Sequence, residues 1–216
     1  MPGFDWIEIA NYASRARADL SASITHWTKD RDGQTAFEVL KRILREKRIV
    51  SSTPDGGYIK AGQRATCFSE SPVTVMTRLF RLAEHDGQVR VFLKWKPYGL
   101  SFWKPVVYQQ FGGRPVLYLS NEEFRRLVTA SGLEKSDAWR VVRFDYEDMD
   151  AAVDFTHERE WRTPGDVAFE SLEGDLRPLA VVNKMSERDE LLREYPLGEG
   201  CPVRGVLCLA DLRAMG

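Results

Sequence analysis

The 216-residue sequence contains few cysteines and few histidines, and neither residue type forms a recognisable metal or disulfide pattern. Its three cysteines, Cys67, Cys201 and Cys208, are odd in number and include no C-x-x-C pair. This argues against a disulfide framework and a zinc site, and we expect small, buried apolar side chains instead. Only three histidines occur, and His157-Glu158 lacks the second histidine of an H-E-x-x-H motif. No metal site is predicted.

Long apolar runs and several common catalytic motifs are also missing. No stretch reaches the roughly 18 apolar residues of a membrane-spanning helix, and the N-terminus lacks the pattern of a signal peptide. We therefore expect a cytoplasmic protein without a membrane partner. There is no G-x-x-x-x-G-K-[S/T] loop and no G-x-S-x-G motif, which argues against P-loop and α/β-hydrolase chemistry. The net charge of −1 gives no global preference for nucleic acid.

The composition that is present suits a globular fold, with 43% hydrophobic and 29% charged residues. We predict one domain over residues 1–216, with residues 1–22 as a leading amphipathic helix. Periodicity predicts further helices over 35–46, 72–84, 121–130 and 186–194. Predicted strands cover 21–27, 64–69, 88–96, 98–102, 115–119, 140–146, 153–162, 179–182 and 203–209. Because no steady βαβα rhythm appears, we expect an α+β fold with mixed, mostly antiparallel sheets and helices packed around them.

The most informative segment is residues 155–165, which contains two glutamates two positions apart. In a strand such residues share a face, whereas in a helix they point about 200° apart. A proline–glycine pair ends any helix here, so we predict a strand with Glu158, Glu160 and Arg162 on one face. Two carboxylates this close raise the pKa of at least one of them unless a cation offsets the charge. The alternative is a solvated edge strand that needs no function.

Residues 158–169 resemble the E-x-E strand and following turn of the ADP-ribosyltransferase superfamily. Residues 67–71 are similar to the S-x-S element of the same superfamily. His26, in the motif T-H-W-T, occupies the place of the first NAD-contacting residue, and histidine, serine and glutamate follow in the order that this fold requires. The histidine resembles one branch, which includes toxins that modify DNA, and the E-x-E resembles the other. Several motifs are also loosely similar to uncharacterised bacterial proteins labelled as phage-abortive-infection factors.

The resemblance implies an ADP-ribosyltransferase-like fold and an enzyme that cleaves the nicotinamide–ribose bond of NAD and transfers ADP-ribose to a protein or nucleic-acid acceptor. Glu160 would stabilise the oxocarbenium-like transition state, and Glu158 would position or deprotonate the acceptor. His26 would contact the adenosine-side ribose, while Ser69 would brace Glu160. The implied NAD-binding candidates are His26, Thr28, Ser69, Tyr98, Phe102 and Tyr118, the last three for stacking on nicotinamide. For a toxin or phage-defence effector, the resemblance also implies an antitoxin.

Other interpretations of the same residues stay open. The Glu158/Glu160 pair also suits the hydrolysis of NAD or of another N-glycoside. A non-enzymatic binding or antitoxin-like module is a third reading. The aromatic candidates lie in apolar strands, where core packing is the ordinary role. Lys94, Lys96 and Lys104 interleave with aromatic residues, which is typical of a groove for single-stranded nucleic acid, although the basic face of a strand is the simpler explanation.

Overall fold

The computed structural model describes residues 21–52, 63–87, 93–129, 135–147 and 152–214. The chain forms two compact units. The first unit comprises Met1–Arg48, Ser71–Val106 and Ala168–Gly216, and the second comprises Ile49–Glu70 and Val107–Val167. The predicted leading helix over residues 1–22 lies almost entirely outside the described residues. The expectation of one domain stays a prediction.

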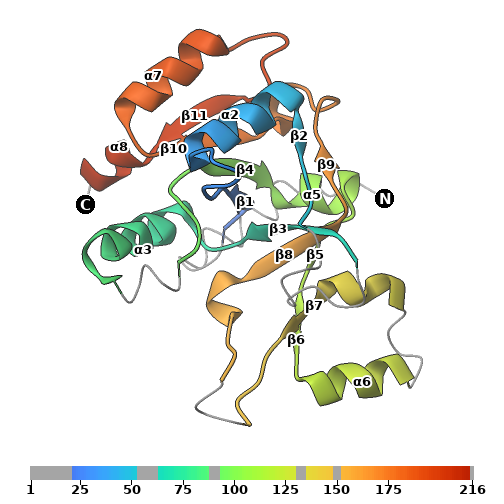
Figure 1. Ribbon diagram of the computed structural model, residues 1–216. Coiled ribbons are helices and arrows are strands. Elements are labelled where there is room, and N and C mark those ends of the chain that lie inside the picture. Colours follow the sequence, from blue (N-terminus) through green and yellow to red (C-terminus); the bar gives the residue numbers. More distant parts are fainter. Residues whose placement is uncertain (1–20, 53–62, 88–92, 130–134, 148–151, 215–216) are drawn as a thin grey trace. The chain divides into compact units, whose positions relative to one another are not determined.

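The first unit contains four strands in the order β11-β10-β4-β1 (Figure 1). Strand β4 (Gly99–Trp103) pairs antiparallel with β1 (Ser23–Trp27) and with β10 (Leu179–Val182). Strands β10 and β11 (Gly205–Cys208) are parallel, and helix α7 (Met185–Glu194) lies between them in the chain. A parallel pair needs such a crossover because a tight turn cannot join its ends. This mixture of pairings confirms the general α+β class.

Helix α2 (Ala36–Glu46) agrees closely with the helix predicted over residues 35–46. Thr35 and Glu38 form a reciprocal capping box at its start, with each side chain bonded to the other's backbone N–H. Lys47 ends the helix in the left-handed conformation, with φ 48°. Sequence-local signals therefore set both ends of this helix.

Of the other helices of the first unit, two were predicted from the sequence and one was not. Helix α3 (Val73–His85) confirms the prediction over residues 72–84, and α7 confirms the one over 186–194. Helix α8 (Leu209–Ala214) follows β11 directly and was not predicted. Because it spans only six residues, it carries too little apolar repeat to be recognised.

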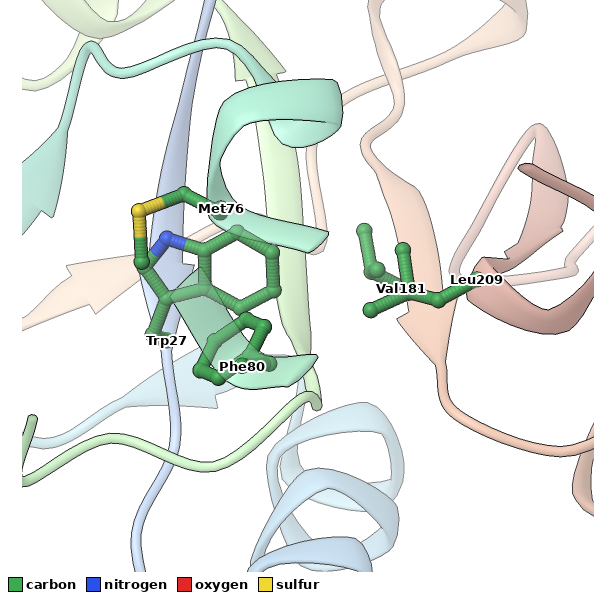
Figure 2. Packing of buried hydrophobic residues seen from close by; sticks show 5 residues of the cluster. All are labelled: Trp27, Met76, Phe80, Val181 and Leu209. Atoms are coloured by element: carbon green, nitrogen blue, oxygen red, sulfur yellow. The ribbon is translucent and has the colours of Figure 1, made fainter. Parts of the chain in front are cut away.

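An apolar cluster lies inside the first unit. Figure 2 shows its five members, Trp27, Met76, Phe80, Val181 and Leu209, all at most 5% exposed. The Trp27 and Phe80 rings meet edge to face, with centroids 5.1 Å apart. Residues of β1, α3, β10 and α8 thus share one core, which is stabilised by the burial of apolar area.

Strands β1 and β4 approach closely at one glycine. A Cβ atom built on Gly99 would collide with the backbone carbonyl of His26, nearer than real Cβ atoms come. Gly99 pairs with Trp27 in the ladder, next to the His26–Leu100 pair. Glycine is therefore required at this position by contact with backbone.

The second unit contains three strands in the order β3-β8-β5 and a separate parallel pair (Figure 1). Strand β8 (Glu160–Pro164) pairs antiparallel with β3 (Ala65–Ser69) and β5 (Arg114–Pro115). Strands β6 (Leu117–Leu119) and β7 (Val141–Arg143) pair in parallel. The strands predicted over residues 64–69, 115–119 and 140–146 are therefore present, in shortened or divided form.

Helix α6 (Asn121–Thr129) confirms the helix predicted after β6, whereas α5 (Lys104–Gln110) was not predicted. The sequence of α5 contains two valines, which favour a strand, and this explains why no helix was predicted. Its proline stands at the second helical position, where the missing N–H costs nothing, so the helix can still form. The remaining short elements are β2 (Arg48–Ile49), β9 (Val167–Ala168) and the 3-10 helices η3 (Lys135–Arg140) and η6 (Gly174–Leu176).

Two predicted strands need correction. Of the strand expected over residues 88–96, the described part, 93–96, is not a strand. Of the strand expected over 153–162, only the portion from Glu160 onward belongs to β8, and Val153 makes an isolated bridge to Asp145. Within the described ranges, no helix combines the length and the apolar character needed to cross a bilayer.

Candidate functional site

The two glutamates of the E-x-E segment lie in different secondary structures. Glu158 ends the 3-10 helix η5 (Thr156–Glu158), and Glu160 is the first residue of β8. Arg159 between them is left-handed, with φ 46° and ψ 52°. The predicted extended backbone through residues 158–160 is therefore wrong, and the two carboxylates do not share a strand face.

A polar turn explains why the chain does not extend before Glu160. The Asp154 carboxylate accepts hydrogen bonds from the Thr156 N–H at 2.8 Å and from its hydroxyl at 2.6 Å. The N–H of Glu158 then donates to the Phe155 carbonyl at 3.0 Å, and that of Arg159 to the Thr156 carbonyl at 3.1 Å. Such side-chain bonds offer the backbone an alternative to a sheet ladder.

Strand β3 holds the end of this turn. The Ser69 hydroxyl donates to the Glu158 carbonyl at 2.8 Å, and the Glu70 N–H donates to the Arg159 carbonyl at 3.1 Å. In the β3–β8 ladder, Ser69 stands directly opposite Glu160. Ser69 thus braces the backbone just before Glu160.

Glu160 forms a buried, two-pronged ion pair with Arg162. Nε of Arg162 donates to Oε1 at 2.8 Å, and Nη2 donates to Oε2 at 3.1 Å. The side chains of Glu160 and Arg162 are only 7% and 3% exposed. Nη1 donates to the carbonyls of Trp139 and Val141, at 3.0 and 3.1 Å. Burial lowers the pKa of Arg162, but the negative charge of Glu160, together with contributions from Cys67, outweighs this, so the net shift is upward and Arg162 stays charged.

Cys67 lies on the same face of the β3–β8 ladder as this ion pair. It stands opposite Arg162, whereas Phe68 stands opposite Trp161 on the other face. Burial, followed by the negative charge of Glu160, raises the pKa of the Cys67 thiol well above its ordinary value. The thiol therefore remains protonated near neutral pH and is not a nucleophile.

An open hollow of about 360 Å³ adjoins the start of β8. The residues that line it are Glu70, Pro115, Val116, Tyr118, Thr156, Arg159, Glu160 and Trp161. The Tyr118 hydroxyl donates to the Phe155 carbonyl at 3.2 Å and accepts from the Glu160 N–H at 3.3 Å. Burial raises the pKa of Tyr118 to about 12. Its hydroxyl is thus committed to backbone, and its ring is left as a wall of the hollow.

Of the eight predicted site residues, Ser69, Tyr118, Glu158 and Glu160 belong to the second unit, where the contacts above connect them. The other four, His26, Thr28, Tyr98 and Phe102, belong to the first unit. Two of these have structural roles. Phe102 is fully buried against Phe169, with ring centroids 5.7 Å apart. The buried Thr28 hydroxyl donates to the Ala36 carbonyl at 2.9 Å and the Tyr98 carbonyl at 3.1 Å.

Tyr98 and His26 keep more accessible positions within the first unit. The Tyr98 hydroxyl donates to Glu187 at 2.8 Å, and its ring lies 5.6 Å from that of Phe37. Burial and the Glu187 hydrogen bond raise the pKa of Tyr98. His26 is partly exposed on β1. The structure favours the simpler interpretation of the lysines over a groove for single-stranded nucleic acid. Trp95, one of the aromatic residues interleaved with them, packs against the apolar cluster.

Comparisons with protein-family models, with curated proteins and with solved structures find no match to this chain. Among the described residues, no group of three or more histidine, cysteine, aspartate or glutamate side chains is arranged to hold a metal ion. The site is therefore defined by its own geometry.

Sequence reasoning did not single out Glu70 and Arg159, which both line the hollow. Glu70 accepts from the Trp161 indole N–H at 2.9 Å, and a nitrogen of Arg159 lies 3.7 Å from its other oxygen. The left-handed conformation of Arg159 has no sequence signal, because a non-glycine residue seldom adopts it. The D-x-T spacing at residues 154–156 is typical of a side-chain-bonded turn and was the one local sign available.

Proposed function

We propose that this protein is an NAD-dependent, ADP-ribosyltransferase-like enzyme that cleaves the nicotinamide–ribose bond and transfers ADP-ribose to a macromolecular acceptor. The observation that carries the proposal is the setting of Glu160. This glutamate lines the hollow, is nine-tenths buried and forms a two-pronged ion pair with Arg162. Because the resembling superfamily uses the second glutamate of E-x-E for catalysis, this is the carboxylate to which the proposal assigns the chemistry.

The chemistry needs a fixed negative charge. Departure of nicotinamide leaves positive charge on the ribose, and a carboxylate stabilises that charge most when it is greatest. A preorganised group in a partly dry site loses little energy to reorganisation during the reaction. The bidentate pair with Arg162 fixes Glu160 in one orientation.

Other residues take the supporting roles in this proposal. Glu158 positions the acceptor from the turn before β8. Ser69 and Tyr118 hold the backbone that leads into Glu160, through the Glu158 carbonyl and the Glu160 N–H. For a toxin or phage-defence effector, the expected partners are NAD, a protein or nucleic-acid acceptor and an antitoxin.

The direct test is release of nicotinamide from NAD, followed by chromatography, with and without protein and nucleic-acid acceptors. We expect release by the wild type and its loss in Glu160→Gln, which keeps the shape and removes the charge. Glu147→Gln is a matched control, because Glu147 is an exposed glutamate of the same unit. Thermal unfolding of both variants separates lost chemistry from lost fold. Full activity of Glu160→Gln would sink the proposed role.

A non-enzymatic binding module is the second candidate, and one observation favours it. Both oxygens of Glu160 are already bonded to Arg162, so the pair is complete without a substrate. No nicotinamide release and no thermal shift with NAD would support this reading. Release that does not depend on any acceptor would instead identify water as the acceptor, and hence an NAD hydrolase.

A further inference from the structure

One wall of the hollow is an aromatic ring fixed by a buried carboxylate. The Trp161 indole N–H donates to Glu70 at 2.9 Å, and the Glu70 side chain is only 13% exposed. Trp161 stands on the strand face opposite the Glu160–Arg162 pair, because neighbouring residues of a strand alternate. The Tyr118 ring, Pro115 and Val116 complete the apolar part of the lining. The hollow therefore offers flat, apolar surface whose polar atoms are already bonded.

Arg159, a positively charged residue with a strained backbone, also lines the hollow. Arg159 has φ 46°, which is unfavourable for a residue that carries a Cβ atom. Its guanidinium lies 3.7 Å from Glu70, so one carboxylate orients both the ring and the cation. Its side chain is 34% exposed, which leaves room for an anion at the mouth. Strain of this kind persists where the surroundings impose it, and it concentrates at ligand sites.

We propose that this hollow binds a nucleotide unit, with its base against Trp161 and its phosphate at Arg159. Planar bases stack on aromatic side chains without regard to sequence, and arginine matches phosphate oxygens with paired N–H donors. The volume of about 360 Å³ suits a single base with its sugar phosphate. It lies near the lower end of the roughly 300–1,000 Å³ typical of small-molecule sites.

The nucleotide unit has two sources with the same chemistry, a free mononucleotide and an exposed residue of single-stranded nucleic acid. The proposal does not depend on NAD cleavage, because the side chains that carry it are Trp161 and Arg159. Binding of a nucleotide by the wild type without release of nicotinamide from NAD would therefore support the nucleotide site and contradict the proposed enzymatic function. This separates failure of the nucleotide site from failure of the proposed enzymatic function.

The test measures anisotropy of a fluorescently labelled thymidine octanucleotide and, in parallel, calorimetric titration with AMP. We expect Trp161→Leu to weaken binding at least about fivefold, while Trp161→Phe, which keeps a stacking ring, weakens it less. Arg159→Gly removes the cation and relieves the backbone strain, so it is expected to fold at least as stably as the wild type. It is expected to weaken binding about tenfold through the loss of a charged hydrogen-bond donor.

Lys47→Gly is the matched control for Arg159→Gly, because Lys47 is another cation in the left-handed conformation, at the end of α2. We expect no change in binding for this variant. Tighter binding of the octanucleotide than of AMP, with a salt slope reduced by about 0.7 in Arg159→Gly, would identify single-stranded nucleic acid as the source. Equal binding of both probes would identify the free nucleotide. Binding of neither probe, or wild-type affinity in Arg159→Gly and Trp161→Leu, overturns the proposal.

Discussion

The buried interiors of the two units differ in the kind of side chain at their centres of interest, apolar in the first and charged in the second. The first unit packs Trp27, Met76 and Phe80 of β1 and α3 into an apolar cluster. The second buries an ion pair, Glu160 and Arg162, beside apolar residues such as Val141. Apolar packing is non-directional and tolerates gradual change, whereas a buried ion pair is stable only while every partner is present. The contrast predicts that the second unit is the more sensitive of the two to the loss of a single charged partner.

The sharpest test of the contrast removes one member of the ion pair. Arg162→Met leaves Glu160 buried without a counter-charge, so we expect the free energy of unfolding to fall by about 3–5 kcal/mol. Urea denaturation measures the change. The double variant Glu160→Leu/Arg162→Met is expected to recover most of it, because no charge is then left alone. A double variant as unstable as Arg162→Met would contradict this account.

The corresponding change in the first unit is Met76→Ala, which opens a cavity beside Trp27 and Phe80. We expect a loss of about 2–5 kcal/mol, depending on how far the neighbours relax. Met76→Leu, which conserves volume, is expected to cost less than about 1.5 kcal/mol. Equal losses for the two variants, again by urea denaturation, would show that this core does not depend on close packing.

Alkaline pH tests the contribution of one partly buried tyrosine of the second unit, Tyr118. Because burial raises the pKa of Tyr118 to about 12, its neutral form is favoured in the folded state. The stability gained from this is fully present below about pH 10 and is lost as the pH rises towards about 12. We expect the wild type to lose more stability than Tyr118→Phe between about pH 9 and 11.5. Parallel pH profiles for the two proteins would show that Tyr118 does not contribute.

The smallest expected effect is a gain in stability from a substitution in the second unit. The Thr163 side chain is fully buried, and its hydroxyl makes no hydrogen bond within the described part of the chain. Thr163→Val removes this unpaired group, so we expect the free energy of unfolding to rise by up to about 1 kcal/mol. Thr66→Val is the matched control, since the Thr66 hydroxyl donates to the Gly165 carbonyl at 2.8 Å. Thr66→Val is expected to lower the free energy of unfolding by about the amount by which Thr163→Val raises it.

The sequence predicted best those elements whose signals are local and repeated. Helix α2 has a capping box and an apolar face, and strand β10 is a short apolar run, and both lie where they were predicted. Helices α5 and α8 were missed because seven and six residues hold too few turns to show a period. The α+β class followed from the mixture of elements and needed no exact boundaries.

Only part of the candidate site could be predicted from the sequence. The importance of residues 158–162 and the common face of Glu160 and Arg162 followed from spacing, and the structure places these two side chains in contact. The turn at Glu158 did not follow, because it depends on a left-handed Arg159 that β3 fixes through Glu70. Contacts between distant segments decide such conformations, and no local pattern records them.

The glycine at position 99 restricts how this sequence can change over time. Any descendant that keeps strands β1 and β4 paired has to retain a residue without a side chain there, since the obstacle is the His26 carbonyl and not a group that substitution can shrink. Glycine paired across from a T-H-W segment is therefore the fingerprint by which we would search for remote members of the lineage.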